Sequence, residues 1–379
     1  ITVSPTANSS QLNIEPELFV DGSYSEANVK YSEVGIIELQ ITDSNYSDVE
    51  VTSGPVSIGR FTPHHFVQTV IEHGQLSNSC NIFAYSGELD TEGKGAIKYL
   101  LPPKIRIQPM NADSIQTKNY INEFVDLDRI TVNAISPTVD ADTEGVNGDK
   151  LSLTAELLKG EAVSSAEAVY SGVIDYTFSA EDNFVYMRSS NAEISVFISN
   201  VDLVLQDVID VDGISTTFVN NGETVNAVKN IDELLGLEVY FGRWNLEDTV
   251  GSEMENLDQI MQLQVFTDEG YQRHSDDSCT RFTFELMTPY SIEDLDPQLT
   301  PVYNSDPSQV TFESGQTRVL ELTAPDTPGK VGVTYEVPLW FKFNWDQSSN
   351  LDQNPTAIAT FGVFDNTGDR VIGEQEIDK

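Results

Sequence analysis

Apolar and polar residues alternate along much of this chain, and the pattern is clearest over residues 237–286. Leu237, Val239 and Phe241 occupy every second position of the first run, and residues 259–266 repeat the pattern after a polar turn. Successive side chains of a β-strand point to opposite faces, so a period of two predicts strands with one buried face. We therefore expect paired strands here, with a turn at 268–270 between two of them.

The same short pattern recurs from one end of the chain to the other, and helical periodicity is nearly absent. Further strands are predicted within 34–39, 66–71, 105–107, 130–134, 151–157, 173–178, 194–198, 201–208, 281–286, 318–322, 331–337, 339–345 and 357–364. Residues 225–235 are predicted as a short helix. Short strands separated by frequent turns are typical of β-sandwiches. The sequence therefore predicts an all-β fold of tandem, antiparallel, Ig-like β-sandwich modules with little helix.

Breaks in the pattern divide the chain into units. Ser53, Gly54 and Pro55 interrupt the first group of strands, residues 179–183 follow the second, and residues 290–306 are irregular. We predict an N-terminal β-unit at 1–62, a second β-sandwich at 63–185 and a third region at 186–379, with a possible further break near 290–305. No internal repeat of fixed period is present, which argues against a solenoid or a propeller.

Charge narrows the range of partners. The 379 residues include 61 acidic and 20 basic side chains, a formal net charge of −41. Such a field repels nucleic acid and anionic membrane surfaces, because both are bound through Lys and Arg. The acidic groups suit a solvated surface in salty water or, in part, the coordination of Ca²⁺. We expect no membrane insertion, since no apolar run reaches about 18 residues. The first residues do not resemble a signal peptide, so we expect a mature portion or an excised fragment.

Signatures of catalysis are missing from the sequence. It contains no phosphate-binding glycine loop, no Gly-x-Ser-x-Gly and no His-Glu-x-x-His. Carboxylates are abundant, but no pair stands at a spacing that indicates a hydrolase. His64 and His65 are adjacent, and on a strand they point to opposite faces, so we do not expect them to chelate one ion. His274 is isolated, and we assign it no role. The sequence predicts a protein that is not an enzyme.

An acidic loop at 140–149 is the candidate metal site. Its oxygen ligands stand at nearly alternate positions around a glycine, as in the first half of an EF-hand loop. They are Asp140, Asp142, Glu144, Asn147 and Asp149. The twelfth position is Leu151, where an EF-hand needs a bidentate Glu, and the flanking segments are predicted strands. The remaining interpretations are a Ca²⁺ site in a β-hairpin and a solvated hairpin tip.

An aromatic segment at 337–345 is the candidate ligand-binding element. If it is one strand, Leu339, Phe341, Phe343 and Trp345 share one face, and Trp340 lies on the other face among polar neighbours. An exposed indole ring can stack on the apolar face of a sugar. The alternative is that Trp340 is a core residue of a sandwich.

Cys80 and Cys279 are the two cysteines of the chain, and each lies in a polar turn before a predicted strand. If the chain is exported, we expect one disulfide between them, which would link the second unit to the third. Closing so long a loop is worth about 5 kcal/mol at most in the chain-entropy treatment. The alternative is two buried free thiols.

Several motifs occur here in the order in which a known family carries them. They lie at 59–66 (GRFTPHHF), 79–85 (SCNIFAY), 241–245 (FGRWN), 251–253 (GSE), 276–280 (DDSCT), 338–346 (PLWFKFNWD), 359–364 (ATFGVF) and 369–372 (DRVI). Over residues 18–372 the chain resembles the large C-terminal region of MshQ-type proteins, which are encoded with the MSHA (mannose-sensitive haemagglutinin) type IV pilus.

The resemblance implies an exported, surface-exposed module of a pilus system with a structural or adhesive role in attachment. Its implied partners are other MSHA pilus proteins, either pilins or minor pilins. It also implies an oxidising compartment, which favours the disulfide between Cys80 and Cys279. Family members often carry a lectin-like domain upstream. The alternative function is a Ca²⁺-assisted carbohydrate-binding module, which would bind surface glycans through Trp340 and the acidic loop.

Overall fold

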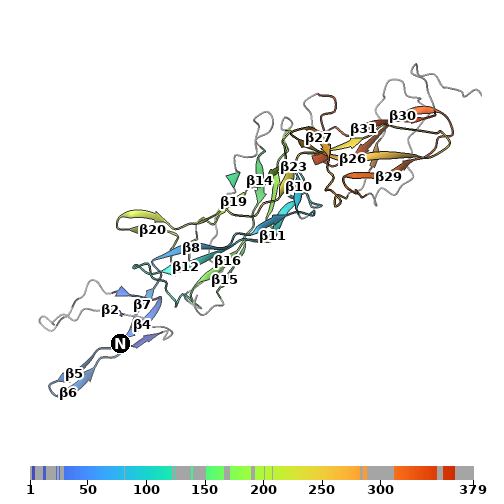
Figure 1. The fold of residues 1–379 in the computed structure, drawn as a ribbon. Helices are drawn as coiled ribbons and strands as arrows, with labels where there is room; N and C mark the ends of the chain where they lie inside the picture. The colour runs from blue at the N-terminus through green and yellow to red at the C-terminus, as the bar shows by residue number, and fades with distance from the viewer. Residues whose placement is uncertain are drawn as a thin grey trace, which may run out of the picture.

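The computed structural model describes residues 2–4, 12–13, 23, 25, 30–80, 82–121, 124, 138–139, 151–165, 171–188, 193–199, 201–206, 208–281, 285–287, 311–347 and 353–362. Strands dominate these ranges, and Figure 1 shows them in an elongated arrangement with the N-terminal and C-terminal sheets at opposite ends. The predicted all-β fold of tandem β-sandwiches is confirmed. Most described strand pairs are antiparallel, with parallel pairing at two places. Within the same ranges, no helix has the length and apolarity that a membrane crossing requires.

The N-terminal sheet is centred on β4 (Gly35–Leu39), which lies between β1 (Thr2–Ser4) and β7 (Val56–Phe61). Two smaller pairs accompany it: β2 (Leu12–Asn13) with β3 (Lys30–Tyr31), and β5 (Thr42–Tyr46) with β6 (Val49–Thr52). Ser47 and Asp48 join β5 to β6 with positive φ angles of 54° and 66°. Two successive left-handed residues are typical of the tight hairpin turn whose twist matches its strands.

The middle of the molecule contains two four-stranded sheets. One has the order β15 (Glu161–Ser164), β16 (Ile174–Thr177), β12 (Lys104–Met110), β8 (His65–Glu72); the other has the order β14 (Leu153–Glu156), β17 (Asn183–Tyr186), β11 (Ile97–Leu101), β9 (Gln75–Ser77). Alternation on β12 buries Ile105 and Ile107 completely. Arg106 between them points away and bonds Asp175 of β16, with Nε 2.7 Å from Oδ1. Opposite faces of one strand therefore supply the core and a cross-strand ion pair.

Shorter strands adjoin the middle sheets. They are β10 (Phe83–Tyr85), β23 (Glu238–Tyr240) and β18 (Phe197–Ile198) in one sheet, β13 (Thr138–Val139), β19 (Val201–Val204) and β22 (Asn230–Ile231) in a second, and the hairpin of β20 (Thr217–Asn220) and β21 (Glu223–Asn226). The short helix predicted at 225–235 is wrong, because this segment belongs to β21 and β22. Asn221 and Gly222 turn the chain with positive φ, and Ile231 is buried by pairing with Leu203. Pairing with distant strands therefore outweighs the local spacing of apolar residues that favours a helix.

The C-terminal sandwich consists of two further sheets. In one, β26 (Leu257–Thr267) pairs with β24 (Gly242–Leu246), β27 (Gly270–Arg273) and β29 (Gln316–Leu322); in the other the order is β25 (Thr249–Gly251), β31 (Thr356–Phe361), β30 (Gly329–Glu336), β28 (Glu285–Met287). Met261, Leu263 and Val265 of β26 point into the core with Trp244 of β24. The alternation predicted over 259–266 is therefore the core face of the longest described strand.

The aromatic segment 337–345 is not the strand that the sequence predicts. After β30, a 3₁₀ turn spans Leu339–Phe341. Pro338 has no N–H to donate to a sheet, and its carbonyl accepts from the N–H of Phe341 at 2.9 Å, which closes the turn. Leu339 is 64% exposed and Phe341 is fully buried, so these two side chains do not share a face.

Most of the buried apolar side chains that the structure describes gather in two clusters. One cluster extends along the sequence from Val34 to Phe241 and fills the middle of the molecule. The other extends from Phe83 to Phe361 and fills the C-terminal sandwich. The division of the chain into units at 1–62, 63–185 and 186–379 stays a prediction.

Candidate functional site

Strand β10 belongs to both apolar clusters, and this dual role locates the junction between the middle of the molecule and the C-terminal sandwich. All three of its residues are buried. Phe83 and Tyr85 lie in the C-terminal cluster, whereas Ala84 between them lies in the middle cluster. Because neighbouring side chains of a strand point to opposite faces, one short strand forms part of both cores. Large rings face the C-terminal sandwich, and the small Ala84 allows close packing on the other side.

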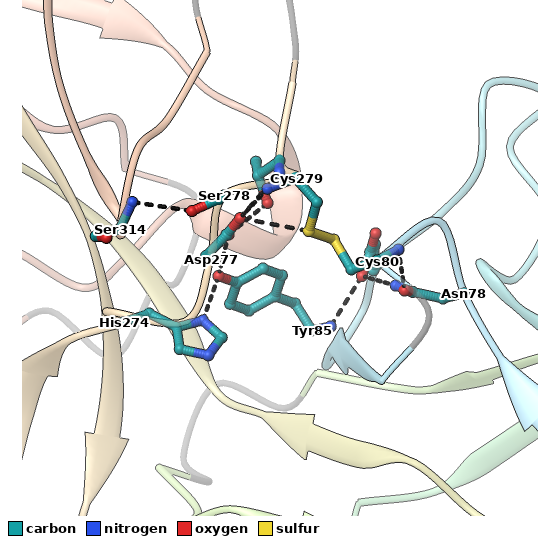
Figure 2. The surroundings of a disulfide bond; sticks show 10 residues. Asn78, Cys80, Tyr85, His274, Asp277, Ser278, Cys279 and Ser314 are labelled. Atoms are coloured by element: carbon teal, nitrogen blue, oxygen red, sulfur yellow. Dashed lines mark hydrogen bonds between the residues drawn. A yellow bond between two sulfur atoms is a disulfide. The ribbon is translucent and has the colours of Figure 1, made fainter.

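A disulfide crosses this junction (Figure 2). Cys80 lies just before β10, Cys279 lies after β27, and the two residues are bonded with 5.5 Å between their Cα atoms and a sequence separation of 199. Each cysteine is held by an acceptor two residues earlier. Asn78 Oδ1 accepts the N–H of Cys80 at 2.6 Å, and Asp277 Oδ1 accepts the N–H of Cys279 at 3.0 Å. Two equivalent side-chain turns therefore fix the backbone on both sides of the bond.

Asp277 is fully buried beside the disulfide and accepts hydrogen bonds from both sides of the junction. Tyr85 of β10 donates its hydroxyl to Oδ2 at 2.6 Å. Thr280 donates its hydroxyl to Oδ2 at 2.5 Å and its N–H to Oδ1 at 2.9 Å. With the N–H of Cys279, four donors surround one carboxylate. A buried carboxylate is stable only when such donors replace its water, so Asp277 needs all of them in place.

The hydrogen bonds of Tyr85 fix the tautomer of His274. The single hydroxyl proton of Tyr85 goes to Asp277, because an ionised carboxylate only accepts. His274 Nδ1 lies 2.7 Å from the same hydroxyl, so Nδ1 carries the hydrogen and donates it to the oxygen. Burial lowers the pKa of His274 and favours this neutral ring. Its Nε2 is buried without a partner among the described residues. The ring packs edge-on against Phe83, with 4.6 Å between centroids.

Arg188 makes a second polar connection across the junction. It follows β17 and donates to the carbonyl oxygens of Gly242 at 2.5 Å, Lys342 at 2.9 Å, and Trp340. Its guanidinium also lies over the ring of Phe241, 4.0 Å from the centroid. Burial lowers the pKa of Arg188 to about 10. The cation therefore connects the backbone of the 3₁₀ turn at Trp340, and that of Lys342 just after it, to Gly242 of β24.

A pocket of about 860 Å³ opens at this junction, a size typical of small-molecule sites. Both sides of the junction line it. The earlier part of the chain contributes, among others, Asn78, Glu88, Asp90, Thr91, Ala96 and Lys98. The C-terminal part contributes Ser278, Cys279, Thr280, Arg281, Pro338 and Trp340. The disulfide thus lies in the pocket wall, and the wall mixes hydroxyls, two acids, two cations and one indole ring.

Glu88 is the acid whose protonation the pocket changes most. Its Oε2 accepts from the N–H of Tyr85 at 2.8 Å and from Asn78 Nδ2 at 3.1 Å. Burial raises the pKa of Glu88 to about 7, since the charged form loses water. Asp90 differs, because Lys98 lies 2.9 Å from its Oδ2 and holds the pKa of Asp90 below its usual value. One acid of the wall therefore titrates near neutrality while the other stays ionised.

The structure places the residues singled out in the sequence as follows. Cys80 and Cys279 are bonded to each other, and Trp340 lies in the wall of the same pocket, half-buried on a turn. The candidate Ca²⁺ ligands Asp140, Asp142, Glu144, Asn147 and Asp149 lie outside the described residues. Within the described ranges, three potential ligands converge at Cys80, Asp277 and Cys279, and there the two sulfurs are bonded to each other.

One geometric expectation about histidines is wrong. His64 and His65 do not point to opposite faces, because β8 begins at His65 and His64 precedes it in a bend. Their Nδ1 atoms lie 3.0 Å apart. His65 is buried and stacks on Phe218 of β20, with 3.7 Å between ring centroids. The pair therefore attaches the β20–β21 hairpin to β8.

Sequence reasoning missed Tyr85, Asp277 and His274. A signal for them was present, since His274 and Asp277 lie five and two residues before Cys279, and Tyr85 lies five residues after Cys80. A bond between the two cysteines must bring their flanking residues together. Nothing in the sequence indicated Arg188 or Glu88, because their roles depend on burial.

Comparisons with known proteins place both parts of the chain in one family. The family model described as DUF6701, third domain, matches residues 33–231, and the model described as DUF6701, fourth domain, matches residues 240–377. No curated protein matches the chain. Among solved structures, the adhesin InvE of Yersinia pseudotuberculosis is similar at 8% identity and a TM-score of 0.22, over 78% of this chain and 59% of that one. A likeness of this size bears on neither the module arrangement nor the function.

Proposed function

Because this chain belongs to the DUF6701 family and spans its third and fourth domains, we propose that it is an exported, non-catalytic module with a structural or adhesive role at the cell surface. The observation that carries the proposal is the covalent link between Cys80 and Cys279 across two β-sandwich regions. Disulfides persist in oxidising compartments outside the cytosol, which supports export.

A linking role fits how force would pass through the junction. A load applied along the chain reaches Cys80 and crosses the bond to Cys279, so the 199-residue segment between them is not extended. The hydrogen bonds of Asp277 and Arg188 lie beside the bond and hold the two regions in one orientation. A surface protein under shear gains from such a connection, because the strands between Cys80 and Cys279 cannot be pulled out while the sulfur–sulfur bond is intact. Strands β8 and β9, which precede Cys80, still bear the load.

The buried Asp277–Tyr85–His274 series supports a structural role over a catalytic one. An aspartate, a hydroxyl and a histidine connected by hydrogen bonds are also the parts of a nucleophilic triad. Here all three side chains are at most 4% exposed, so a substrate has no access to them. The hydroxyl proton of Tyr85 goes to Asp277, away from the histidine. The geometry is that of a buried network centred on Asp277, whose carboxylate has its four donors.

Within this role, we propose association with an MSHA-type pilus through pilins or minor pilins. The motifs at 59–66, 276–280 and 338–346 support it through their resemblance to MshQ-type proteins. Affinity purification of the tagged protein from its native host tests the association. Co-purification of pilin subunits is expected, and purification without any pilus protein would contradict it.

A second candidate function is Ca²⁺-assisted carbohydrate binding. The position of Trp340 in a junction pocket favours the carbohydrate part. The Ca²⁺ part is supported by the sequence of the loop 140–149 alone. Glycan binding that a chelator abolishes would support the combined function, and equal binding with and without chelator would remove the metal from it.

The structural proposal is tested in cells of the native host. Replacing the chromosomal copy with Cys80→Ser/Cys279→Ser is expected to reduce attachment under flow more than attachment without flow. Surface amounts of parent and variant are compared by antibody labelling of intact cells, so that loss of export is separated from loss of strength. Equal attachment under flow at equal surface amounts would refute a load-bearing role.

A further inference from the structure

We propose that the junction pocket binds a short, uncharged saccharide without a metal ion, with a sugar ring stacked on Trp340 and hydroxyls bonded to Glu88 and Lys98. This inference gives the adhesive side of the proposed function a site and a ligand class, and it rests on the chain being displayed at the cell surface. Nothing in the pocket requires the acidic loop.

Trp340 has the features of a rigid stacking surface. It lies in the pocket wall and is half-buried, whereas Trp244 is fully buried in the C-terminal core. Its neighbour Phe341 is anchored in that core, and Arg188 bonds the carbonyl of Trp340 itself. The backbone that carries the indole ring is therefore held in place before a ligand arrives. A binding surface that needs no reordering loses less conformational entropy on binding.

The polar wall offers both acceptors and donors near this ring. Glu88 uses Oε2 for Tyr85 and Asn78, and its Oε1 has no hydrogen-bond partner among the described residues. Lys98 gives one bond to Asp90, and an ammonium group has three hydrogens to donate. A sugar hydroxyl can donate to a carboxylate and accept from an ammonium at once. Hydroxyl-rich ligands match a wall with this pairing of groups.

The charge of the wall distinguishes an uncharged sugar from an anionic one. Over the whole chain, acidic residues outnumber basic ones by 61 to 20. In the pocket, Glu88 and Asp90 are balanced by Lys98 and Arg281. The balanced wall has little net charge to attract an anion, and the net charge of −41 disfavours any anion that approaches the molecule, whereas an uncharged sugar is not repelled.

Both sides of the junction are needed for the site, because Glu88 and Lys98 come from one side and Trp340 from the other. The disulfide lies between them in the wall through Cys279. The position of the Trp340 ring relative to Glu88 and Lys98 therefore depends on the disulfide.

The test is titration of the oxidised full chain with uncharged oligosaccharides, sialylated or uronic-acid oligosaccharides, and a neutral peptide, each with and without EDTA. We expect the chain to bind uncharged saccharides, and we expect EDTA to leave the affinity unchanged. Trp340→Ala is expected to weaken it at least about tenfold, as loss of an aromatic stack does. Trp345→Ala is the matched control, since Trp345 packs near Arg243 outside the pocket lining and should leave affinity unchanged.

Glu88 gives an independent readout. Its carboxylate accepts a stronger, charge-assisted bond when ionised, so affinity should rise as pH increases through about 7. Glu88→Gln should remove this pH dependence. The pocket assignment is overturned if the chain binds no saccharide or binds acidic saccharides alone. It is also overturned if EDTA abolishes binding, or if Trp340→Ala binds as tightly as the parent. Weak attachment in the double cysteine variant, together with normal attachment in Trp340→Ala, would overturn the pocket and leave the structural role intact.

Discussion

The N-terminal sheet and the junction are both built from short strands, yet they differ in what surrounds the strands. In the sheet of β1, β4 and β7, β7 is exposed over nearly its whole length, and β6 of the adjoining hairpin is exposed throughout. Val51 on β6 is 48% exposed. At the junction, Tyr85, Asp277 and His274 are all at most 4% exposed and are bonded to one another.

The difference shows that strand pairing alone does not position a functional side chain in this molecule. Both regions contain paired strands, such as β4 with β7 and β10 with β23. At the junction, buried polar groups and a covalent bond add a defined orientation between two cores. Stability and function should therefore be sensitive to substitution at the junction and insensitive in the exposed hairpin.

The largest effect is expected from removal of the disulfide. Cys80→Ser/Cys279→Ser frees a segment of 199 residues and should lower the free energy of unfolding by about 5 kcal/mol at most, through the larger entropy of the unfolded chain. Denaturation in urea, followed by tryptophan fluorescence, measures it. The parent in reducing agent serves as the control and should unfold like the variant. No change in either sample would contradict a stabilising role for the bond.

Asp277→Ala should have the next largest effect, about 4 kcal/mol, because four donors lose their acceptor in a buried site. Asp276→Ala is the matched control. It removes an exposed carboxylate from the adjacent position and should change stability by less than about 0.5 kcal/mol. Thermal unfolding by circular dichroism separates the two outcomes. Similar losses in both variants would mean that the charge of this turn matters and its buried network does not.

Glu88→Gln should be stabilising, by about 2 kcal/mol above pH 7. The pKa of Glu88 is raised from 4.5 to about 7 in the folded chain, so folding favours the protonated acid. This contribution is fully present below about pH 4.5 and is lost as pH rises through about 7. Gln cannot ionise, so the variant avoids that loss and should match the parent at pH 4.5. Stability measured from pH 4.5 to 8 tests the sign, with the exposed Glu92→Gln as control. A variant less stable than the parent at pH 8 would contradict burial as the cause.

The smallest effect should come from Val51→Thr in the exposed hairpin, below about 0.5 kcal/mol. Val333→Thr in β30 is its counterpart, since Val333 is fully buried and a hydroxyl there lacks water. The buried substitution should cost about 2 kcal/mol. Equal losses of unfolding free energy in the two variants would contradict the difference between the exposed hairpin and the buried core.

The sequence predicted the fold through periodicity, and it did so best where one face is buried. The alternation over 259–266 became β26, the central strand of its sheet. Prediction was wrong at 225–235 and 337–345, where pairing with distant strands and the missing N–H of Pro338 decided the structure. The cysteine pair was identified from its isolation in the sequence. The groups around it were missed because burial and tautomer depend on contacts between residues about 190 positions apart, such as Tyr85 with His274.

The central claim is that the bond between Cys80 and Cys279 carries force past the segment of chain between these two residues. Single-molecule stretching of the full chain between its two ends tests it directly. In the oxidised parent, the segment between the cysteines should stay unextended. After reduction, or in Cys80→Ser, the total extension should increase by about 68 nm, the length of 199 residues at about 3.4 Å each. The same total extension in oxidised and reduced chains would contradict the claim.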